Sequence, residues 1–435
     1  MKRRREALAL TVLLLLSWAA PAAAATCIIE ETPAATLLLP YFEVDLNNPN
    51  GLTTLFSMNN ASAAAVLAHV VIWSDLAVPV LGFNVYLTGY DVQTINLRDI
   101  LISGALPPTA SSGQDPSDNI SPQGVFSQDR DFASCAGVLP PSNLPDNFIQ
   151  HLQLALTGRP SPVLDNRCAG RNLGDNIARG YVTVDVVSNC TLRFPGDAGY
   201  FAAGGTGDAT NQNELWGDYF YVNPGESFAQ GETLVHIQAD ASNPELSTAG
   251  QYTFYGRYVG WSAADNRQPL STNFAVRFLN GGLFSGGSSL VVWRDPKINQ
   301  QAFVCPAILG IRPPWFPLNP EARLAVVFDE QEQPLFLQEP IIDPQPSPPT
   351  FVPFPAAAQR TRVGGTALPV PFQFGWLYLN LNDSVVVAGP NPPEDPAAAQ
   401  AWVTVIMDAN GRFSVGFEAI KLDRACKAKH LFPGF

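Results

Sequence analysis

The sequence predicts an all-β protein built from two tandem antiparallel β-sandwich domains, with one helix-containing insertion. Apolar and polar residues alternate repeatedly, which is typical of strands with one buried face. Turn-forming residues are abundant, with 34 Gly and 39 Pro, whereas charged residues make up only 14% of the chain, against about 25% in typical soluble proteins. In addition, the sequence that begins near residue 52 is similar to the one that begins near residue 271, which indicates an internal repeat.

Alternation with period two is clearest in two stretches near the C-terminus. Phe274, Val276 and Phe278 share one face of the first, and residues 412–420 alternate in the same way after turn residues 408–411, which predict a hairpin. Further strands are expected at residues 36–46, 53–60, 66–75, 83–90, 92–101, 180–187, 218–222, 232–240, 322–330 and 375–382.

Two segments interrupt this pattern of strands. Residues 103–178 are rich in Pro, Ser, Asp and Asn, and we interpret them as an insertion. Within it, residues 144–158 have apolar residues at helical spacing and end on Gly158, which predicts one helix. Residues 339–358 are rich in proline and are expected to form a linker or a long surface loop.

The internal echo predicts the division into domains. Residues 52–75 and 271–295 each contain a Thr-led strand, a short connection and an apolar strand closing on Trp-x-Asp. Trp73 and Trp293 are separated by 220 positions. This offset predicts β-sandwich domains at 26–250 and 251–435, although two unrelated hairpins with similar sequences are the alternative.

The stretches "TTLFSMNNAS" and "AHVVIWSD", together with their echo, resemble bacterial exported immunoglobulin-like β-sandwich domains. The resemblance covers two segments of about 25 residues each, and its motifs are unspecific. It implies a sandwich fold and a location in the cell envelope or outside the cell. It implies no catalytic residue.

The N-terminal segment has the pattern of a bacterial signal peptide. Basic residues 2–5 precede an apolar run, and a small-residue cleavage site ends at Ala25. We therefore expect a secreted, periplasmic or cell-surface protein with no transmembrane helix after cleavage. Cleavage removes four basic residues and one acid, which shifts the net charge from -13 to about -16 and disfavours nucleic acid as a partner. The terminal Phe435 leaves an outer-membrane β-barrel as an alternative.

The even number of cysteines predicts disulfide bonds in an exported protein. Six cysteines would form three disulfides, for which 15 connectivities exist. Cys135 and Cys168 bracket one irregular segment and are expected to pair. The remaining cysteines would then pair as Cys27 with Cys190 and Cys305 with Cys426.

None of the four histidines has metal-ligand spacing. His69 lies in a strand that is apolar on both faces, which predicts a neutral, hydrogen-bonded core residue. His236 is expected to be a half-exposed strand residue, and His151 and His430 to have structural or surface roles. We expect no cofactor and no metal site, apart from an adventitious calcium site that the sequence does not locate.

No catalytic constellation is evident, so we expect a protein that is not an enzyme: a structural, adhesive or ligand-binding protein whose partner is another protein, a surface or a glycan. Trp315 and Phe316, between prolines, and Trp261, after a strand, are the candidate ligand-binding aromatics, with a contact between the domains as the alternative for both sites. The alternative is a secreted carbohydrate hydrolase, which needs two carboxylates at the correct separation. The candidate acids are Glu43, Asp45, Asp218, Asp329, Glu330 and Glu332.

Overall fold

The structure of the protein is a computed structural model. This structure describes residues 32–107, 143–243, 247–249, 252–296, 300–305, 325–336, 354–381, 400–410, 412 and 414–422. The predicted signal peptide, Trp315, Phe316, His430 and three of the six cysteines lie outside these residues. Most of the proline-rich segment does so too.

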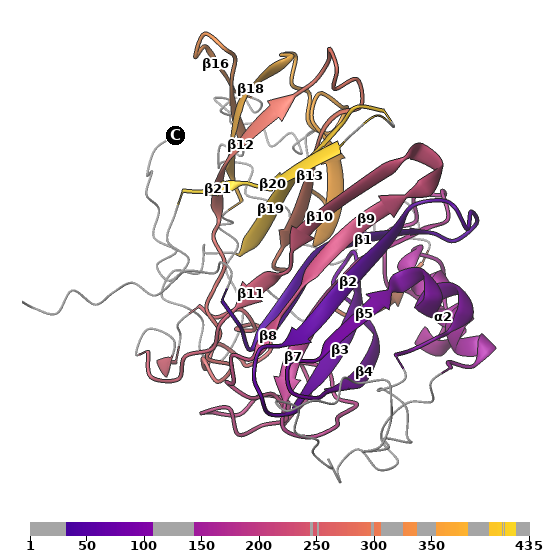
Figure 1. The fold of residues 1–435 in the computed structure, drawn as a ribbon, viewed down its shortest axis with the longest axis vertical. Helices are drawn as coiled ribbons and strands as arrows, with labels where there is room; N and C mark the ends of the chain where they lie inside the picture. Colours follow the sequence, from indigo (N-terminus) through magenta and orange to yellow (C-terminus); the bar gives the residue numbers. More distant parts are fainter. Residues whose placement is uncertain are drawn as a thin grey trace, which may run out of the picture.

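The N-terminal half contains two antiparallel sheets (Figure 1). Sheet I has the strand order β11-β1-β7-β3-β4, and sheet II has the order β10-β9-β2-β5, with β8 also paired to β2. The strands of sheet I are β11 (Val235–Ile237), β1 (Thr36–Asp45), β7 (Ile177–Val187), β3 (Val66–Ser74) and β4 (Pro79–Leu87). Those of sheet II are β10 (Phe228–Thr233), β9 (Asp218–Asn223), β2 (Thr53–Asn60), β5 (Val92–Asn96) and β8 (Leu215–Trp216).

The C-terminal half contains two more antiparallel sheets, so the prediction of an all-β protein with several antiparallel sheets is confirmed. Sheet III has the order β16-β15-β18-β12-β21, and sheet IV has the order β17-β13-β19-β20. The strands of sheet III are β16 (Pro334–Phe336), β15 (Ala325–Phe328), β18 (Phe374–Asn380), β12 (Asn273–Leu279) and β21 (Ile420–Lys421). Those of sheet IV are β17 (Ala358–Arg362), β13 (Gly287–Arg294), β19 (Ala401–Asp408) and β20 (Ser414–Glu418).

The two stretches with similar sequences, residues 52–75 and 271–295, pair with strands that follow them in the same chain order. The neighbours β4, β5, β7 and β9 of the first stretch correspond to β17, β18, β19 and β21 of the second. β2 lies between β5 and β9, and β12 lies between β18 and β21. The next strands match as well, because β3 lies between β4 and β7, and β13 lies between β17 and β19. In both cases, consecutive strands of the stretch belong to different sheets.

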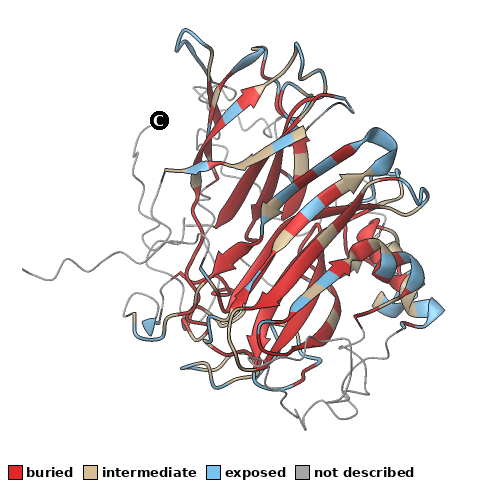
Figure 2. Cartoon of the chain, in the orientation of Figure 1, coloured by how far each residue is buried: buried red, intermediate tan, exposed pale blue. Residues whose placement is uncertain are grey.

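The central strands of sheet IV, β13 and β19, are buried on both faces and connect two hydrophobic cores. In β13, Leu290 and Val292 belong to the core shared with sheet III, whereas Val291 and Trp293 belong to the core shared with sheets I and II. This alternation follows from the strand geometry, in which successive side chains point to opposite faces. Figure 2 shows the buried residues continuing from the lower sheets into sheet IV.

The helix expected within the insertion is present as α2 (Asp146–Leu156). It packs against β3, β4 and β7, and the chain leaves it through Gly158, whose φ of +68° favours glycine. Short helical turns at η1 (Asp99–Ser103) and η4 (Pro162–Leu164) flank α2 in the chain, and a third, η5 (Pro224–Glu226), follows β9. Among the described residues, no helix has the length and apolar character needed to span a bilayer.

The predicted disulfide connectivity is wrong at two of its three bonds. Cys168 is bonded to Cys305, not to Cys135, so Cys305 does not pair with Cys426 either. The bond joins β6 (Arg167–Cys168), in the insertion, to the end of β14 (Phe303–Val304), and these two strands pair with each other. Cys190 is also disulfide-bonded, and its predicted partner Cys27 lies outside the described residues.

Candidate functional site

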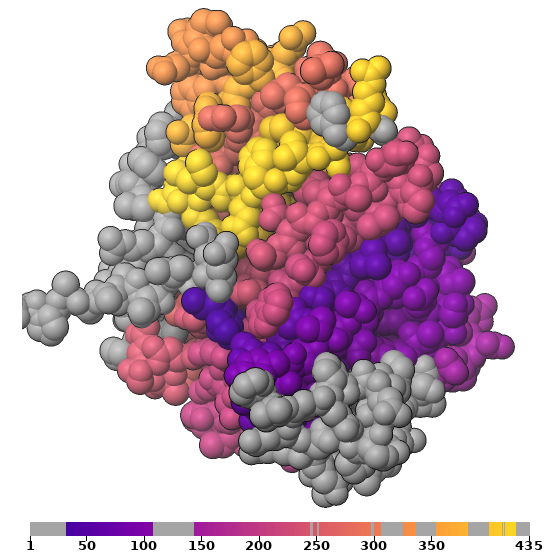
Figure 3. Space-filling view, viewed as in Figure 1, coloured from indigo at the N-terminus to yellow at the C-terminus, as the bar shows by residue number. Residues whose placement is uncertain are grey.

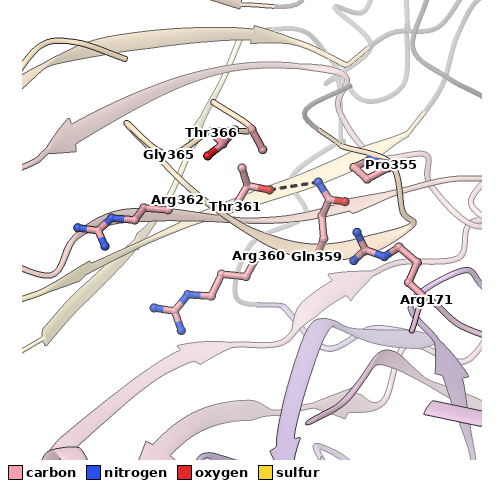
Figure 4. A pocket seen from close by; sticks show the side chains of 9 residues that line it. Arg171, Pro355, Gln359, Arg360, Thr361, Arg362, Gly365 and Thr366 are labelled. Carbon is pink, nitrogen blue, oxygen red and sulfur yellow. Dashed lines mark hydrogen bonds between the residues drawn. The ribbon is translucent and has the colours of Figure 1, made fainter. Parts of the chain in front are cut away.

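A pocket with a volume of about 310 Å³ lies along β17, at the edge of sheet IV (Figure 4). This volume is at the lower end of the range for small-molecule sites, about 300–1,000 Å³. Its lining is unusual for a protein with 38 acidic and 25 basic residues, because it contains three arginines. The lining residues are Arg171, Pro355, Gln359, Arg360, Thr361, Arg362, Gly365, Thr366 and Ala367.

The side chains of β17 alternate across the strand. Gln359 and Thr361 are buried on one side and share a hydrogen bond of 3.2 Å from Nε2 to Oγ1. Arg360 and Arg362 extend to the other side, as Figure 4 shows. The strand thus presents two guanidinium groups two positions apart, while its intervening residues pack against the protein.

Part of the open edge of β17 is already occupied by backbone hydrogen bonds. The N–H groups of Ala357 and Ala358 both donate to the carbonyl oxygen of Asp75, and the N–H of Gly365 donates to the carbonyl oxygen of Arg362. Because alternate residues of an antiparallel strand direct their backbone groups away from its partner, the backbone groups of Arg360 point outward, and they have no partner among the described residues.

Arg171 is held at one end of the pocket by Asp75, which follows β3. Its Nε lies 2.6 Å from Oδ2 of Asp75, and its backbone N–H donates to Oδ1 at 3.0 Å. Burial raises the pKa of Asp75, and the adjacent guanidinium of Arg171 opposes that shift. No described residue binds the two terminal nitrogens of Arg171, so they are available to a ligand.

At the other end, Arg360 is only loosely neutralised. Its Nη1 lies 3.6 Å from Oε2 of Glu43, a carboxylate that also contacts Arg179 at 3.4 Å and accepts a hydrogen bond from Tyr41. Arg362 is exposed and forms no ion pair with any described residue.

The local balance of charge is positive. Four arginines at or near the pocket, including Arg179, face three carboxylates, since Asp175 pairs with Arg179 at 2.6 Å. A guanidinium presents donors in a planar fork that matches carboxylate, sulfate and phosphate oxygens. The pocket can therefore bind an anionic ligand, and its cationic groups lie at both ends, as Figure 4 shows.

The aromatic residues expected to bind a ligand are not found at this pocket. Trp261 is only 1% exposed and contacts Tyr252 with ring centroids 5.1 Å apart, so it packs in the interior rather than being displayed. Its indole packs directly on Gly256, where a Cβ atom would lie 2.7 Å from the ring. Trp315 and Phe316 lie outside the described residues.

The candidate carboxylates lie in different parts of the fold. Glu43 is in sheet I, Asp218 begins β9 in sheet II, and Asp329 follows β15 of sheet III. Asp45 and Asp329 each accept backbone hydrogen bonds within their own turns. Across the described ranges, no group of three or more His, Cys, Asp or Glu side chains is arranged to hold a metal ion.

His69 is a buried core residue, as predicted. It is 0% exposed, its Nδ1 lies 3.0 Å from Oδ1 of Asn84, and burial lowers its pKa. His151 is also buried, with its Nδ1 2.7 Å from Oγ of Ser161. The prediction for His236 is wrong, because it is 4% exposed rather than half-exposed.

Sequence reasoning missed the arginine pocket. The available signal was the sequence "AQRTR" at residues 358–362, which alternates arginine with smaller residues in a chain poor in basic residues. No spacing in the sequence relates Arg171 to these residues, because only the contact between β17 and the residue that follows β3 brings it to the pocket. Comparisons of the chain with protein-family models, curated protein sequences and solved structures found no match.

Proposed function

We propose that this protein is an exported, non-catalytic binding protein whose arginine pocket recognises a small ligand with more than one anionic group. The observation that carries the proposal is the presence of Arg171, Arg360 and Arg362 in the lining of one pocket of a strongly acidic protein. The disulfide between Cys168 and Cys305 supports export, because such bonds persist in oxidising compartments.

The finer description of the fold belongs to the same proposal. We infer two tandem immunoglobulin-like sandwiches, one from sheets I and II and one from sheets III and IV. The matching strand neighbours of β2–β3 and β12–β13 support this inference. The pocket then lies where the edge of the second sandwich meets the end of β3 in the first.

Isothermal titration of the purified chain tests the proposed function. The probes are acetate, sulfate, citrate and trigalacturonate, which differ in size and in number of anionic groups. We expect citrate or trigalacturonate to bind more tightly than acetate, and binding to weaken with added salt. Arg362→Ala should weaken binding by about 10-fold or more, because a hydrogen bond to a charged group contributes about 1.5–3 kcal/mol.

Arg412→Ala is the matched control. Arg412 is exposed beside the β19–β20 hairpin and does not line the pocket. Its substitution therefore changes the net charge by the same amount as Arg362→Ala but leaves the pocket unaltered. The proposal fails if none of the four anions binds, or if Arg412→Ala weakens binding as much as Arg362→Ala.

A further inference from the structure

The outer face of sheet II carries a row of alternating aromatic and acidic side chains that the proposed function does not use. Trp216, Asp218 and Phe220 follow one another at two-residue spacing along β8 and β9. Both strands pair with β2, with Trp216 opposite Asn59 and Phe220 opposite Leu55. Tyr219, between Asp218 and Phe220, and Tyr221, after Phe220, are buried on the inner face. The row therefore lies on the solvent side of the sheet.

Both aromatic rings of this row are accessible. Trp216 is 42% exposed and Phe220 is 44% exposed. Phe220 lies across Gly231 of β10, where a Cβ atom would come within 2.3 Å of the ring. Figure 1 shows β5, β2, β9 and β10 side by side at the front of the molecule, and Figure 3 shows that their outer face forms a broad surface.

A short hydrogen-bond chain positions the acid between the rings. Asn59 Nδ2 donates to Oγ of Ser57 at 3.1 Å, and Ser57 Oγ donates to Oδ1 of Asp218 at 2.7 Å. No described residue donates to Oδ2 of Asp218, which is half-buried. Asn59 is itself buried, so the acceptor that this row leaves open to a ligand is Oδ2 of Asp218.

The charge of this face excludes the class of ligand proposed for the arginine pocket. The five strands of sheet II contain two acids, Asp218 and Glu232, and no lysine or arginine. An anionic ligand would be repelled, and a protein partner would meet a polar row at the centre, where interfaces are usually apolar. A sugar hydroxyl can donate to Oδ2 of Asp218, and the C–H faces of pyranose rings can pack on the aromatic rings.

We infer that this face binds a neutral glycan, with Trp216 and Phe220 as stacking platforms and Asp218 as the hydroxyl acceptor between them. Four residues along a strand span about 13 Å, a length that suits an oligosaccharide rather than a single sugar. Ser57 and Asn59 are positioning residues, because they orient the carboxylate of Asp218.

Binding of cellohexaose, xylohexaose, laminarihexaose and chitohexaose to the purified chain, followed by tryptophan fluorescence and calorimetry, tests this inference. At least one probe should bind, and Trp216→Ala or Asp218→Asn should weaken it about 10-fold or more. Tyr378→Ala is the matched control, since Tyr378 is a 40% exposed aromatic on sheet III, and it should bind like the wild type. Arg362→Ala should also leave this binding unchanged, which separates the glycan face from the arginine pocket.

Three results would overturn the inference. The first is that no neutral hexasaccharide binds at millimolar concentration, and the second is that Trp216→Ala binds as well as Tyr378→Ala. The third is that the wild type sediments as a dimer that Trp216→Ala converts to a monomer, which would assign the face to a second copy of the chain. Thermal unfolding of each variant verifies that the exposed substitutions leave the fold intact.

Discussion

Trp73 and Trp293, which are 220 positions apart in the sequence, contact the same ring in the folded protein. Trp73 stacks on Tyr181 with ring centroids 5.6 Å apart and an angle of 2° between the planes. Trp293 meets Tyr181 edge-on at 6.0 Å. Since Trp73 lies near the end of β3 and Trp293 near the end of β13, the two Trp-x-Asp segments converge on β7, and Tyr181 links the two halves of the chain.

Tyr181 is therefore expected to be a major contributor to the stability of both halves. Tyr181→Ala should lower the free energy of unfolding by about 3–5 kcal/mol, because it leaves a cavity between two buried indoles. Tyr181→Phe keeps the ring and removes a buried hydroxyl that has no hydrogen-bond partner among the described residues. The free energy of unfolding of Tyr181→Phe should therefore stay within about 1 kcal/mol of the wild-type value. Urea denaturation measures the free energy of unfolding of both variants. A large loss of stability in Tyr181→Phe would contradict the view that Tyr181 acts through the packing of its ring.

The two aspartates of the Trp-x-Asp segments should differ in importance. Asp295 accepts hydrogen bonds from Arg257 at 2.6 Å, Gln400 at 2.9 Å and Tyr252 at 3.1 Å, and the side chain of Arg257 is only 2% exposed. Asp295→Ala leaves that charge buried and uncompensated, which costs about 3–5 kcal/mol. Asp75→Ala leaves Arg171 without its carboxylate partner, but the side chain of Arg171 is 22% exposed, so water can solvate the guanidinium.

We therefore expect Asp75→Ala to be the milder substitution, at about 1–3 kcal/mol. Chemical denaturation of the two variants side by side ranks them. Equal losses of unfolding free energy would show that water does not stabilise the unpaired charge of Arg171 better than that of Arg257.

Alternation in the sequence was sufficient to predict most strands and the role of His69. β3 is apolar on both faces, and all nine of its residues are buried. The spacing of apolar residues likewise predicted α2, because a helix buries one face at a regular period. These features depend on residues close together in the chain, so local patterns carry the information.

Features that depend on contacts between distant segments were not predictable in this way. Cys168 pairs with Cys305 because β6 and β14 form a two-stranded sheet, and neither strand has a recognisable pattern at two residues in length. Trp261 resembled a displayed aromatic because it follows a strand-like segment, yet the chain from Tyr252 to Gln268 is an irregular segment packed inside the protein. Arg171 joins the pocket only through Asp75.

The disulfide between Cys168 and Cys305 should contribute strongly to stability. It closes a loop with a sequence separation of 137, and loops of about 100 residues correspond to roughly 4–5 kcal/mol of chain entropy. Cys168→Ala combined with Cys305→Ala should lower the free energy of unfolding by about 3–5 kcal/mol. Peptide mapping without reductant provides the direct check, and a peptide joining Cys135 to Cys168 would contradict the connectivity.

Stability should fall as the pH drops below about 6.5, the usual pKa of histidine. Burial lowers the pKa of both His69 and His151 in the folded protein. Below about pH 6.5 the unfolded chain therefore binds protons that the folded chain does not, and the free energy of unfolding decreases with falling pH. Asp75 and Asp265 act in the opposite direction, because burial raises their pKa values.

A substitution at His69 isolates its share of this pH dependence. Nδ1 of His69 must carry a proton to donate to Oδ1 of Asn84, so the second proton would be added at Nε2, which is buried without a partner among the described residues. His69→Gln removes that titration and should reduce the slope of unfolding free energy against pH by up to about 1.4 kcal/mol per unit below about pH 6.5. Urea denaturation at about pH 7.5, 6.5 and 5.5, on either side of the usual histidine pKa, measures the slope, with His151→Gln as a second buried histidine for comparison. An unchanged slope in His69→Gln would mean that the folded protein accommodates the charged ring.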